Sequence, residues 1–270
     1  MSTDDRREQL KAEYIALRGV WSPVWDQLLD ADPEFFAAYL KFSGVPFRDG
    51  GHLDPKIKEL LLVAIDAAGT HLYEPGARVH IRRAIELGAT KQELLEVLEL
   101  TATLGIHAAN IGVPILFEVL GARAESLDED YSERQERLKA EFTENRGYWH
   151  PFWHEILVID PDFFEGYVEF SSHPWKHGVL EPKVREFVYC AFDVAATHLY
   201  TSGLKLHIEN ALGYGATPQE VMEVIELASP LGMAAVGMAL PIVLEELAVA
   251  SGDGRQQVAE RPADSEEGAR

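Results

Sequence analysis

Cysteine is almost absent from this sequence of 270 residues, since Cys190 is the only one. One cysteine cannot form a disulfide within the chain, so a disulfide-stabilised secreted scaffold is excluded. A pair of redox-active thiols within one chain is excluded for the same reason. Cys190 lies in an apolar stretch, and we therefore expect it to be a buried structural residue, not a reactive thiol.

Positive charge is also scarce. Lysine and arginine together number 24 against 45 acidic residues, which gives a net charge of −21. Nucleic acid requires a basic face, so we expect no nucleic-acid partner. The first residues, MSTDDRREQ, are polar, and no run reaches the roughly 18 apolar residues of a membrane span. These absences predict a cytoplasmic protein with no membrane partner, in which an anionic ligand needs a local cluster of cations.

The chain contains a duplicated unit. Residues 55–73 read PKIKELLLVAIDAAGTHLY and residues 182–200 read PKVREFVYCAFDVAATHLY. Matching residues lie 127 positions apart here, as His80 and His207 do, and 128 apart upstream. Because this period exceeds the roughly 20–50 residues of solenoid repeats, each copy should be a small domain. We predict a first repeat over 1–122, a charged linker over 123–139, a second repeat over 140–249 and a disordered tail over 250–270.

Helix signals dominate and no segment reads as a strand, so we predict an all-α fold. Thr90 to Glu93 and Thr217 to Glu220 form capping boxes. Several further helices should begin where a cap-like residue precedes proline, at Ser22, Asp32, Asp54, Asp160 and Glu181. In the first repeat the predicted helices lie near 4–18, 23–31, 33–43, 55–70, 76–87, 91–103 and 107–122. The apolar helices 55–70 and 182–198 should be central, with the two repeats related by a pseudo-two-fold axis.

The repeats keep a polar set while their apolar residues change. The identical pairs are Glu59/Glu186, Asp66/Asp193, Thr70/Thr197 and His71/His198. Cores tolerate apolar exchanges at modest cost, whereas a buried polar group must keep its partner. The kept set is therefore either a shared hydrogen-bond network or a shared site, and both interpretations stay open.

A longer pattern resembles the carboxymuconolactone decarboxylase family, whose relatives include alkylhydroperoxidase D-type proteins. In the first repeat it comprises Glu59, His80-Ile81, Ala84-Ile85, Gly88-Ala89-Thr90, Glu93 and residues 96–100. In the second it comprises Glu186, His207-Ile208, Ala211-Leu212, Gly215-Ala216-Thr217, Glu220 and residues 223–227. Residues 105–110, GIHAAN, are similar to the closing segment of the decarboxylase branch. The peroxidase branch carries a C-x-x-C motif, but those places hold Tyr73 and Gly76, and Tyr200 and Gly203, so we predict no thiol peroxidase activity.

The resemblance implies a cofactor-free acid/base lyase (a carboxy-lyase) or isomerase in aromatic-compound catabolism. Its partner would be a small carboxylated lactone or another enolisable acid. Such chemistry needs a cation for the carboxylate, a hydrogen-bond donor for the enolate and a proton carrier. The catalytic candidates are His80 and His207 as proton carriers, with Glu59, Glu186, His71 and His198. The substrate-binding candidates are Arg78, Lys205, Tyr73, Tyr200, Asp66, Asp193, His107 and Asn110.

Structural alternatives stand beside these assignments. His71 and His198 can cap the long helices, and Arg78 and Lys205 can lie on solvated helix faces. His71, His80, Glu59 and Asp66 could form a metal set, but the His71 to His80 spacing matches no short metal motif, so we predict no metal. His107 and Asn110 correspond to Ala234 and Gly237, which favours the first repeat as the better site.

A non-catalytic function is the competing class. A repeated helical unit without redox cysteines could be an assembly protein or a small-ligand-binding protein. Single-unit relatives form trimers and hexamers, so the resemblance implies a homo-oligomer, a trimer of two-repeat chains.

Overall fold

The computed structural model describes residues 2–123 and 131–251. Over these ranges all regular structure is helical and no strand occurs, so the all-α prediction is confirmed. The predicted tail lies outside the described residues from position 252 onwards, while Ala250 and Ser251 still belong to the last helix. Residues 124–130 of the predicted linker also lie outside them, and from Glu133 onwards the linker is helical.

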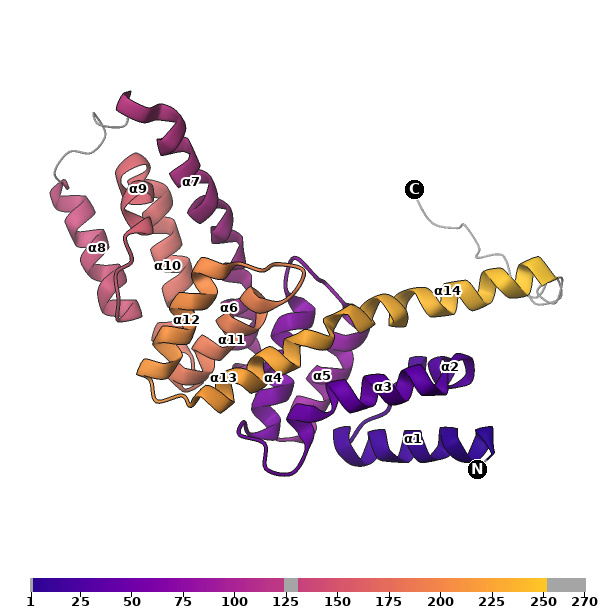
Figure 1. Cartoon of the computed structure of the whole chain (residues 1–270). Helices are drawn as coiled ribbons and strands as arrows, with labels where there is room; N and C mark the ends of the chain where they lie inside the picture. The colour runs from indigo at the N-terminus through magenta and orange to yellow at the C-terminus, as the bar shows by residue number, and fades with distance from the viewer. Residues whose placement is uncertain (1, 124–130, 252–270) are drawn as a thin grey trace, which may run out of the picture. The chain divides into compact units, whose positions relative to one another are not determined.

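The helices follow the expected order in both repeats (Figure 1). The first repeat contains α1 (Thr3–Arg18), α2 (Val24–Ala31), α3 (Pro33–Ser43), η1 (Val45–Phe47), α4 (Pro55–Ala67), α5 (Glu74–Glu86), α6 (Lys91–Ala102), η2 (Thr103–Ile106), α7 (His107–Leu120) and η3 (Gly121–Arg123). The second contains α8 (Glu133–Arg146), α9 (Phe152–Ile159), α10 (Pro161–His177), α11 (Pro182–Val194), α12 (Thr201–Gly213), α13 (Pro218–Ala228), η4 (Ser229–Gly232) and α14 (Met233–Ser251).

Capping explains where several helices begin. Thr90 and Thr217 accept a hydrogen bond from the backbone N–H of Glu93 and Glu220, and each glutamate accepts one in return from the threonine N–H. Asp32 and Asp160 cap α3 and α10 by accepting from a backbone N–H three residues on. Glu181, by contrast, makes no side-chain cap although α11 begins directly after it.

The two central helices end earlier than the sequence predicts, at Ala67 and Val194 instead of residues 70 and 198. After each helix the chain turns back, with Leu72 and Leu199 at φ of 50° and 51°, in the left-handed region. The backbone N–H of Tyr200 then donates to the carbonyl of Asp193 at 2.9 Å. This turn places a histidine and a tyrosine beside the aspartate of the last helical turn, which positions the candidate site.

The chain forms two compact units, and these do not coincide with the two repeats. We call Met1–Gly44 with Pro230–Arg270 the terminal unit, and Val45–Ser229 the central unit. In the terminal unit, α14 of the second repeat packs against α1 to α3 of the first. Its core consists of Leu10, Tyr14, Leu28, Leu29, Phe36 and Leu40, against which Met233, Val236 and Leu240 of α14 pack.

In the central unit, α7 of the first repeat packs in the same way against α8 to α10 of the second (Figure 1). Ile106, Ala109 and Val113 lie against a core that includes Phe142, Trp153 and Phe164. The last helix of each repeat is thus covered by the first helices of the other repeat. A division of the chain at the repeat boundary therefore does not separate independent cores.

The middle of the central unit shows the pseudo-two-fold relation directly. α4 and α11 are buried almost all round, and they pack against each other. Glu96 of the first repeat accepts hydrogen bonds from the backbone of Val179 and Leu180 in the second. Glu223 of the second repeat accepts the equivalent bonds from residues 52 and 53 of the first. The predicted pseudo-symmetry is confirmed by this reciprocal exchange.

Two helical stretches of the described chain are long and apolar enough to cross a membrane by length and composition alone, Lys91–Arg123 and Pro218–Ser251. The sequence analysis predicted no such segment because it considered only uninterrupted apolar runs. Each of these stretches instead consists of two helices that follow each other directly. Length and composition are weak evidence, because core helices of soluble proteins meet the same criteria. The first stretch carries buried polar residues, His107 and Asn110, which belong to the site described next.

Candidate functional site

A histidine–glutamate pair lies at the equivalent place in each repeat. In the second repeat, His207 Nδ1 of α12 lies 2.6 Å from Glu186 Oε2 of α11. In the first, His80 Nδ1 of α5 lies 2.7 Å from Glu59 Oε2 of α4. Both glutamates are buried, so each carboxylate holds a proton on Nδ1 of its histidine and leaves Nε2 as the reactive nitrogen. His80 and His207, the predicted proton carriers, thus each lie against the predicted glutamate of their own repeat.

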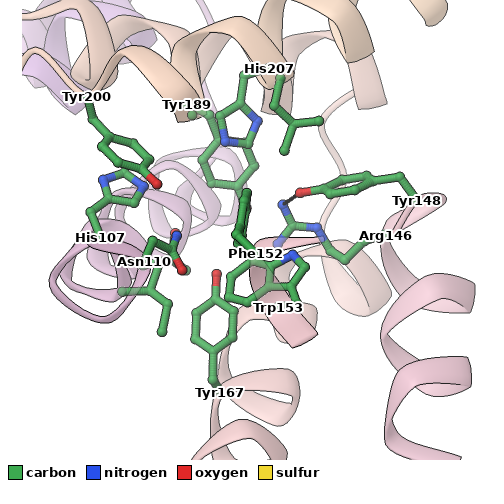
Figure 2. Close-up of a pocket in the computed structure, with 14 residues that line it drawn as sticks. His107, Asn110, Arg146, Tyr148, Phe152, Trp153, Tyr167, Tyr189, Tyr200 and His207 are labelled. Atoms are coloured by element: carbon green, nitrogen blue, oxygen red, sulfur yellow. Dashed lines mark hydrogen bonds between the residues drawn. The ribbon is translucent and has the colours of Figure 1, made fainter. Parts of the chain in front are cut away.

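His207 of the second-repeat pair lines a pocket (Figure 2). The free space at its centre is about 20 Å³, enough for about one water molecule. Its lining comes from six helices of the central unit and the segments between them. The lining residues are Thr103, Ile106, His107, Asn110, Arg146, Tyr148, Phe152, Trp153, Tyr167, Tyr189, Tyr200, Gly203, Leu206 and His207.

Arg146 is the cation of this cavity. It ends α8, is only 3% exposed, and forms no ion pair with a carboxylate of the described chain. Its guanidinium lies 5.1 Å from the Tyr189 ring centre and 5.0 Å from that of Trp175, while its Nε has no hydrogen-bond partner. Its Nη2 donates to the Tyr148 hydroxyl at 3.5 Å, and since no carboxylate partners it, this buried guanidinium can still bind an anion.

The surrounding tyrosines provide hydrogen-bond donors to the cavity. Burial raises the pKa of Tyr167 to about 12 and also raises the pKa of Tyr148 and Tyr189. These phenols therefore remain protonated at neutral pH. Figure 2 shows the Tyr167 hydroxyl pointing into the cavity opposite His207, with Arg146 at its side. Burial alone would lower the pKa of Arg146, but nearby Tyr189 and the other phenols keep it above its ordinary value.

A second polar group forms the cavity wall next to Tyr200. His107 Nδ1, at the start of α7, lies 2.6 Å from Nε2 of His198, and the Tyr200 ring stacks on His107 at 3.9 Å between centres. Asp193 Oδ1 lies 3.7 Å from the same His107 nitrogen. Burial, followed by the charge of Glu186, raises the pKa of Asp193 to about 8. Burial lowers the pKa of His107 to about 3, helped by His198 and His207.

The placement of His107 and Asn110 corrects the expected ranking of the two repeats. Both residues belong to the first repeat, but they line the cavity of the second, because α7 packs among the helices of that repeat. At the matching sequence positions the chain has Ala234 and Gly237. The reason for ranking the first repeat as the better site is therefore wrong, because these two residues line the cavity of the second repeat, while the relative activity of the two repeats stays a prediction.

The first-repeat residues form a simpler cluster. His71 Nε2 lies 3.6 Å from Asp66 Oδ1, and His80 Nε2 lies 3.7 Å from Asp66 Oδ2. The rings of His71 and Tyr73 are 5.7 Å apart between centres. Burial lowers the pKa of His71 and raises that of Tyr73, whose hydroxyl also faces the Asp66 charge. In this repeat Nε2 of His80, the predicted proton carrier, faces a carboxylate and not an arginine.

Arg78 and Lys205, the predicted carboxylate-binding cations, are not brought to the cavity. Their side chains are 72% and 79% exposed. Arg78 Nε donates to Glu74 at 2.8 Å, and Lys205 lies 3.9 Å from Glu209, each one turn away on its own helix. The structure thus matches the alternative of a solvated helix face. Arg146 was missed, although the sequence carries a signal for it: Arg18-Gly19 and Arg146-Gly147 match between the repeats.

The glycines at the thiol places of the peroxidase relatives have a structural reason. A Cβ atom on Gly203 would lie 2.5 Å from Oδ2 of Asp193, and one on Gly76 would collide with Asp66 in the same way. The close approach of the aspartate to the next helix therefore requires glycine. Cys190 is buried in α11, and burial, followed by the charges of Glu186 and Asp193, raises the pKa of its thiol well above the usual value.

The fold and the site together define an all-α protein of two helical repeats, each with a buried histidine–glutamate pair. The family model of the carboxymuconolactone decarboxylase family matches residues 33–111 and 161–245, and this chain belongs to that family. A solved structure from Burkholderia xenovorans LB400, described as a candidate gamma-carboxymuconolactone decarboxylase subunit, is 52% identical. The match covers 90% of this chain and 98% of that one, with a TM-score of 0.85. No functionally curated protein matches the chain.

Proposed function

We propose that the second-repeat cavity is the active site of an acid/base lyase (a carboxy-lyase) or isomerase acting on a small carboxylated lactone or a similar enolisable acid. The observation that carries this proposal is Arg146, a buried arginine without a carboxylate partner, across a cavity from the His207–Glu186 pair. The family and the Burkholderia structure support the same class of substrate.

Each part of the reaction has a residue suited to it. Arg146 binds a carboxylate of the substrate, with geometry that favours a bidentate pair. As the bond to the departing carbon dioxide breaks, its electrons move through the conjugated system to the lactone carbonyl. The protonated hydroxyls of Tyr148 and Tyr167 stabilise the negative charge that develops on this oxygen. His207 Nε2 delivers a proton to carbon, while Glu186 stabilises the imidazolium form that delivers it. In an isomerase reaction the same nitrogen first removes a proton.

This proton transfer is cofactor-free, because every group it uses belongs to the chain. The cavity with room for about one water molecule must widen to admit a substrate. Tyr148, between α8 and α9, and Phe152, at the start of α9, both line the cavity, and their movement would open it. Closure around the substrate would then exclude water from the reacting groups.

The test is turnover of a panel of carboxylated lactones, followed by carbon dioxide release and by ultraviolet absorbance of the conjugated product. We expect activity that His207→Ala lowers by roughly 10²–10⁴-fold. Full activity in a folded His207→Ala variant would overturn the mechanism.

The small size of the cavity favours one further candidate, a non-catalytic protein that binds small carboxylates. The same arginine and tyrosines would hold such a ligand without reaction. Thermal stabilisation by carboxylated lactones that are recovered unchanged would favour this candidate.

We also propose that the chain works in the cytoplasm as a homo-oligomer, a trimer of two-repeat chains, without nucleic-acid or membrane partners. The net charge of −21 supports the exclusion of nucleic acid. Light scattering should give three times the chain mass of 30.1 kDa. A strictly monomeric mass would contradict the assembly.

A further inference from the structure

Three potential metal ligands converge on one point in the wall of the second-repeat cavity. They are His107 Nδ1 at the start of α7, Asp193 Oδ1 of α11 and His198 Nε2 in the turn before α12. The two nitrogens are 2.6 Å apart, and they lie 3.7 Å and 3.9 Å from the carboxylate oxygen. Among the described residues, this is the one such group whose ligand atoms all lie within 4.8 Å of one another.

The carboxylate of Asp193 lacks a hydrogen-bond partner. Its side chain is completely buried, and neither carboxylate oxygen receives a hydrogen bond. Burying a carboxylate without a donor or a cation is costly, and native structures seldom leave such a group unsatisfied. A proton shared between His107 and His198 would satisfy the two nitrogens but would leave Asp193 without a partner. A cation between all three atoms satisfies all of them.

We propose that His107, Asp193 and His198 bind a divalent transition-metal ion of the zinc class. Two imidazole nitrogens and one carboxylate oxygen suit zinc, cobalt or nickel, whereas magnesium and calcium prefer all-oxygen sites. With metal–ligand bonds of about 2.0–2.1 Å, ligand atoms in a tetrahedral site lie roughly 3.3 Å apart. The three observed separations, 2.6, 3.7 and 3.9 Å, lie on either side of this value, so side-chain shifts of less than about 1 Å complete the geometry.

Such an ion would link the two repeats. His107 comes from the first repeat, and Asp193 and His198 come from the second. The ion would therefore fix the start of α7 against the end of α11 and hold one wall of the cavity, with the stacked Tyr200, in place. The proton transfer assigned to His207 does not use the ion, so the two proposals are independent.

The first repeat supplies a matched control. Asp66 and His71 occupy the positions of Asp193 and His198, but the position of His107 is taken by Ala234. Asp66 and His71 lie 3.6 Å apart, as close as their counterparts, but the matching sequence position offers no third ligand. An exposed pair, His173 and His177, lies on one face of α10 with ring centres 4.8 Å apart, and it serves as the control for adventitious binding.

The experiment uses full-length, untagged protein stripped with a chelator and then dialysed against zinc or cobalt. Metal content is measured by mass spectrometry, and the visible absorption of bound cobalt reports its ligands. We expect one ion per chain and a cobalt spectrum typical of nitrogen and oxygen ligands. The binding should be lost in His107→Ala, in His198→Ala and in Asp193→Asn, with folding checked by circular dichroism.

His71→Ala, Asp66→Asn and His173→Ala should each retain the ion. Zinc should also raise the melting temperature of the wild-type protein but not that of His107→Ala. The proposal is overturned if the wild-type protein binds no ion, if binding survives both His107→Ala and His198→Ala, or if it is lost in His173→Ala. Because no substrate is present, failure here leaves the lyase proposal standing, and an inactive lyase leaves the metal result standing.

Discussion

The two predicted proton carriers, His80 and His207, each lie against the glutamate of their own repeat at nearly the same distance, and they differ in what faces Nε2. His207 shares a cavity with Arg146, whereas Nε2 of His80 lies near Asp66. We expect His207→Ala to lower turnover by roughly 10²–10⁴-fold and His80→Ala to leave most of it. Steady-state kinetics of the two variants provide the measurement. A larger loss in His80→Ala would place the reaction in the first repeat.

Arg146 should control substrate affinity. Replacing it with methionine keeps the apolar contacts to the aromatic rings but removes the cation, so KM for carboxylated substrates should rise by about 100-fold or more. Arg146→Lys should be intermediate, because an ammonium group cannot form the bidentate pair. Arg78→Met, which removes an exposed cation, is the matched control and should change neither KM nor kcat. An unchanged KM in a folded Arg146→Met variant would exclude it as the carboxylate site.

The thiol of Cys190 should be inert. Its pKa is raised above the ordinary value by burial and then by Glu186 and Asp193, so the reactive thiolate is disfavoured at pH 8 and forms only at higher pH. Alkylation of the native protein should be slower than that of the unfolded chain by more than about a hundredfold, since labelling requires opening of the core. Equal rates, measured by mass spectrometry, would contradict this assignment.

At the scale of residues, the sequence identified the members of both histidine–glutamate pairs because they lie on neighbouring helices of one repeat. His107 and Asn110 were assigned to the first-repeat site, because the sequence does not show which repeat the last helix of a repeat packs against. Arg78 and Lys205 were predicted to bind the carboxylate because each lies two residues before its histidine in the sequence. Arg146 lies far from them in sequence and reaches the cavity only through tertiary packing.

At the scale of elements, capping residues in the sequence predicted where several helices begin. The ends of the two central helices had no such sequence signal. The starts of α6 and α13 depend on local hydrogen bonds within four residues. α4 and α11 end where the backbone becomes extended at Ala68 and Ala195, with ψ of 136° and 134°, and alanine gives no sequence signal for a helix end. The helices predicted from the sequence were consequently three and four residues too long at their C-terminal ends.

The capping box of α6 offers a direct test of this local control. Thr90→Ala removes the hydrogen bond to the Glu93 N–H and should lower the free energy of unfolding by about 1 kcal/mol. Lys91→Ala, an exposed change in the same first turn, should stay within about 0.5 kcal/mol. Denaturant unfolding measures both. Equal effects of the two changes would show that the cap contributes nothing.

At the scale of the whole molecule, the duplication was evident in the sequence but its packing was not. Each repeat has its own capped helices, yet its final helix is covered by the other repeat's first helices in the terminal and the central unit alike. This exchange creates a cavity to which both repeats contribute. The two sites therefore differ in their surroundings. Both repeats have a histidine–glutamate pair, but only that of the second repeat has His107 and Asn110 beside it among the described residues.

The reciprocal glutamates should be the strongest polar links between the repeats in the central unit. Glu96 is buried, and besides two backbone N–H groups it holds Arg185, whose Nε lies 2.6 Å from Oε1. Glu96→Ala leaves a buried guanidinium and two backbone donors without their acceptor, which should lower the free energy of unfolding by about 3–5 kcal/mol. Glu74→Ala, which breaks only an exposed pair with Arg78, should cost less than about 1 kcal/mol.

The link can also be tested from the opposite side. A Cβ atom on Gly178 would collide with the Glu96 carboxylate, and Gly51 occupies the matching position beside Glu223. Gly178→Ala should therefore displace Glu96 and destabilise the protein, and its effect should largely vanish in a Glu96→Ala background, because the clash and the bond involve the same carboxylate. A double-mutant cycle by denaturant unfolding measures this coupling. Additive effects of the two changes would mean that the glutamate does not hold the repeats together.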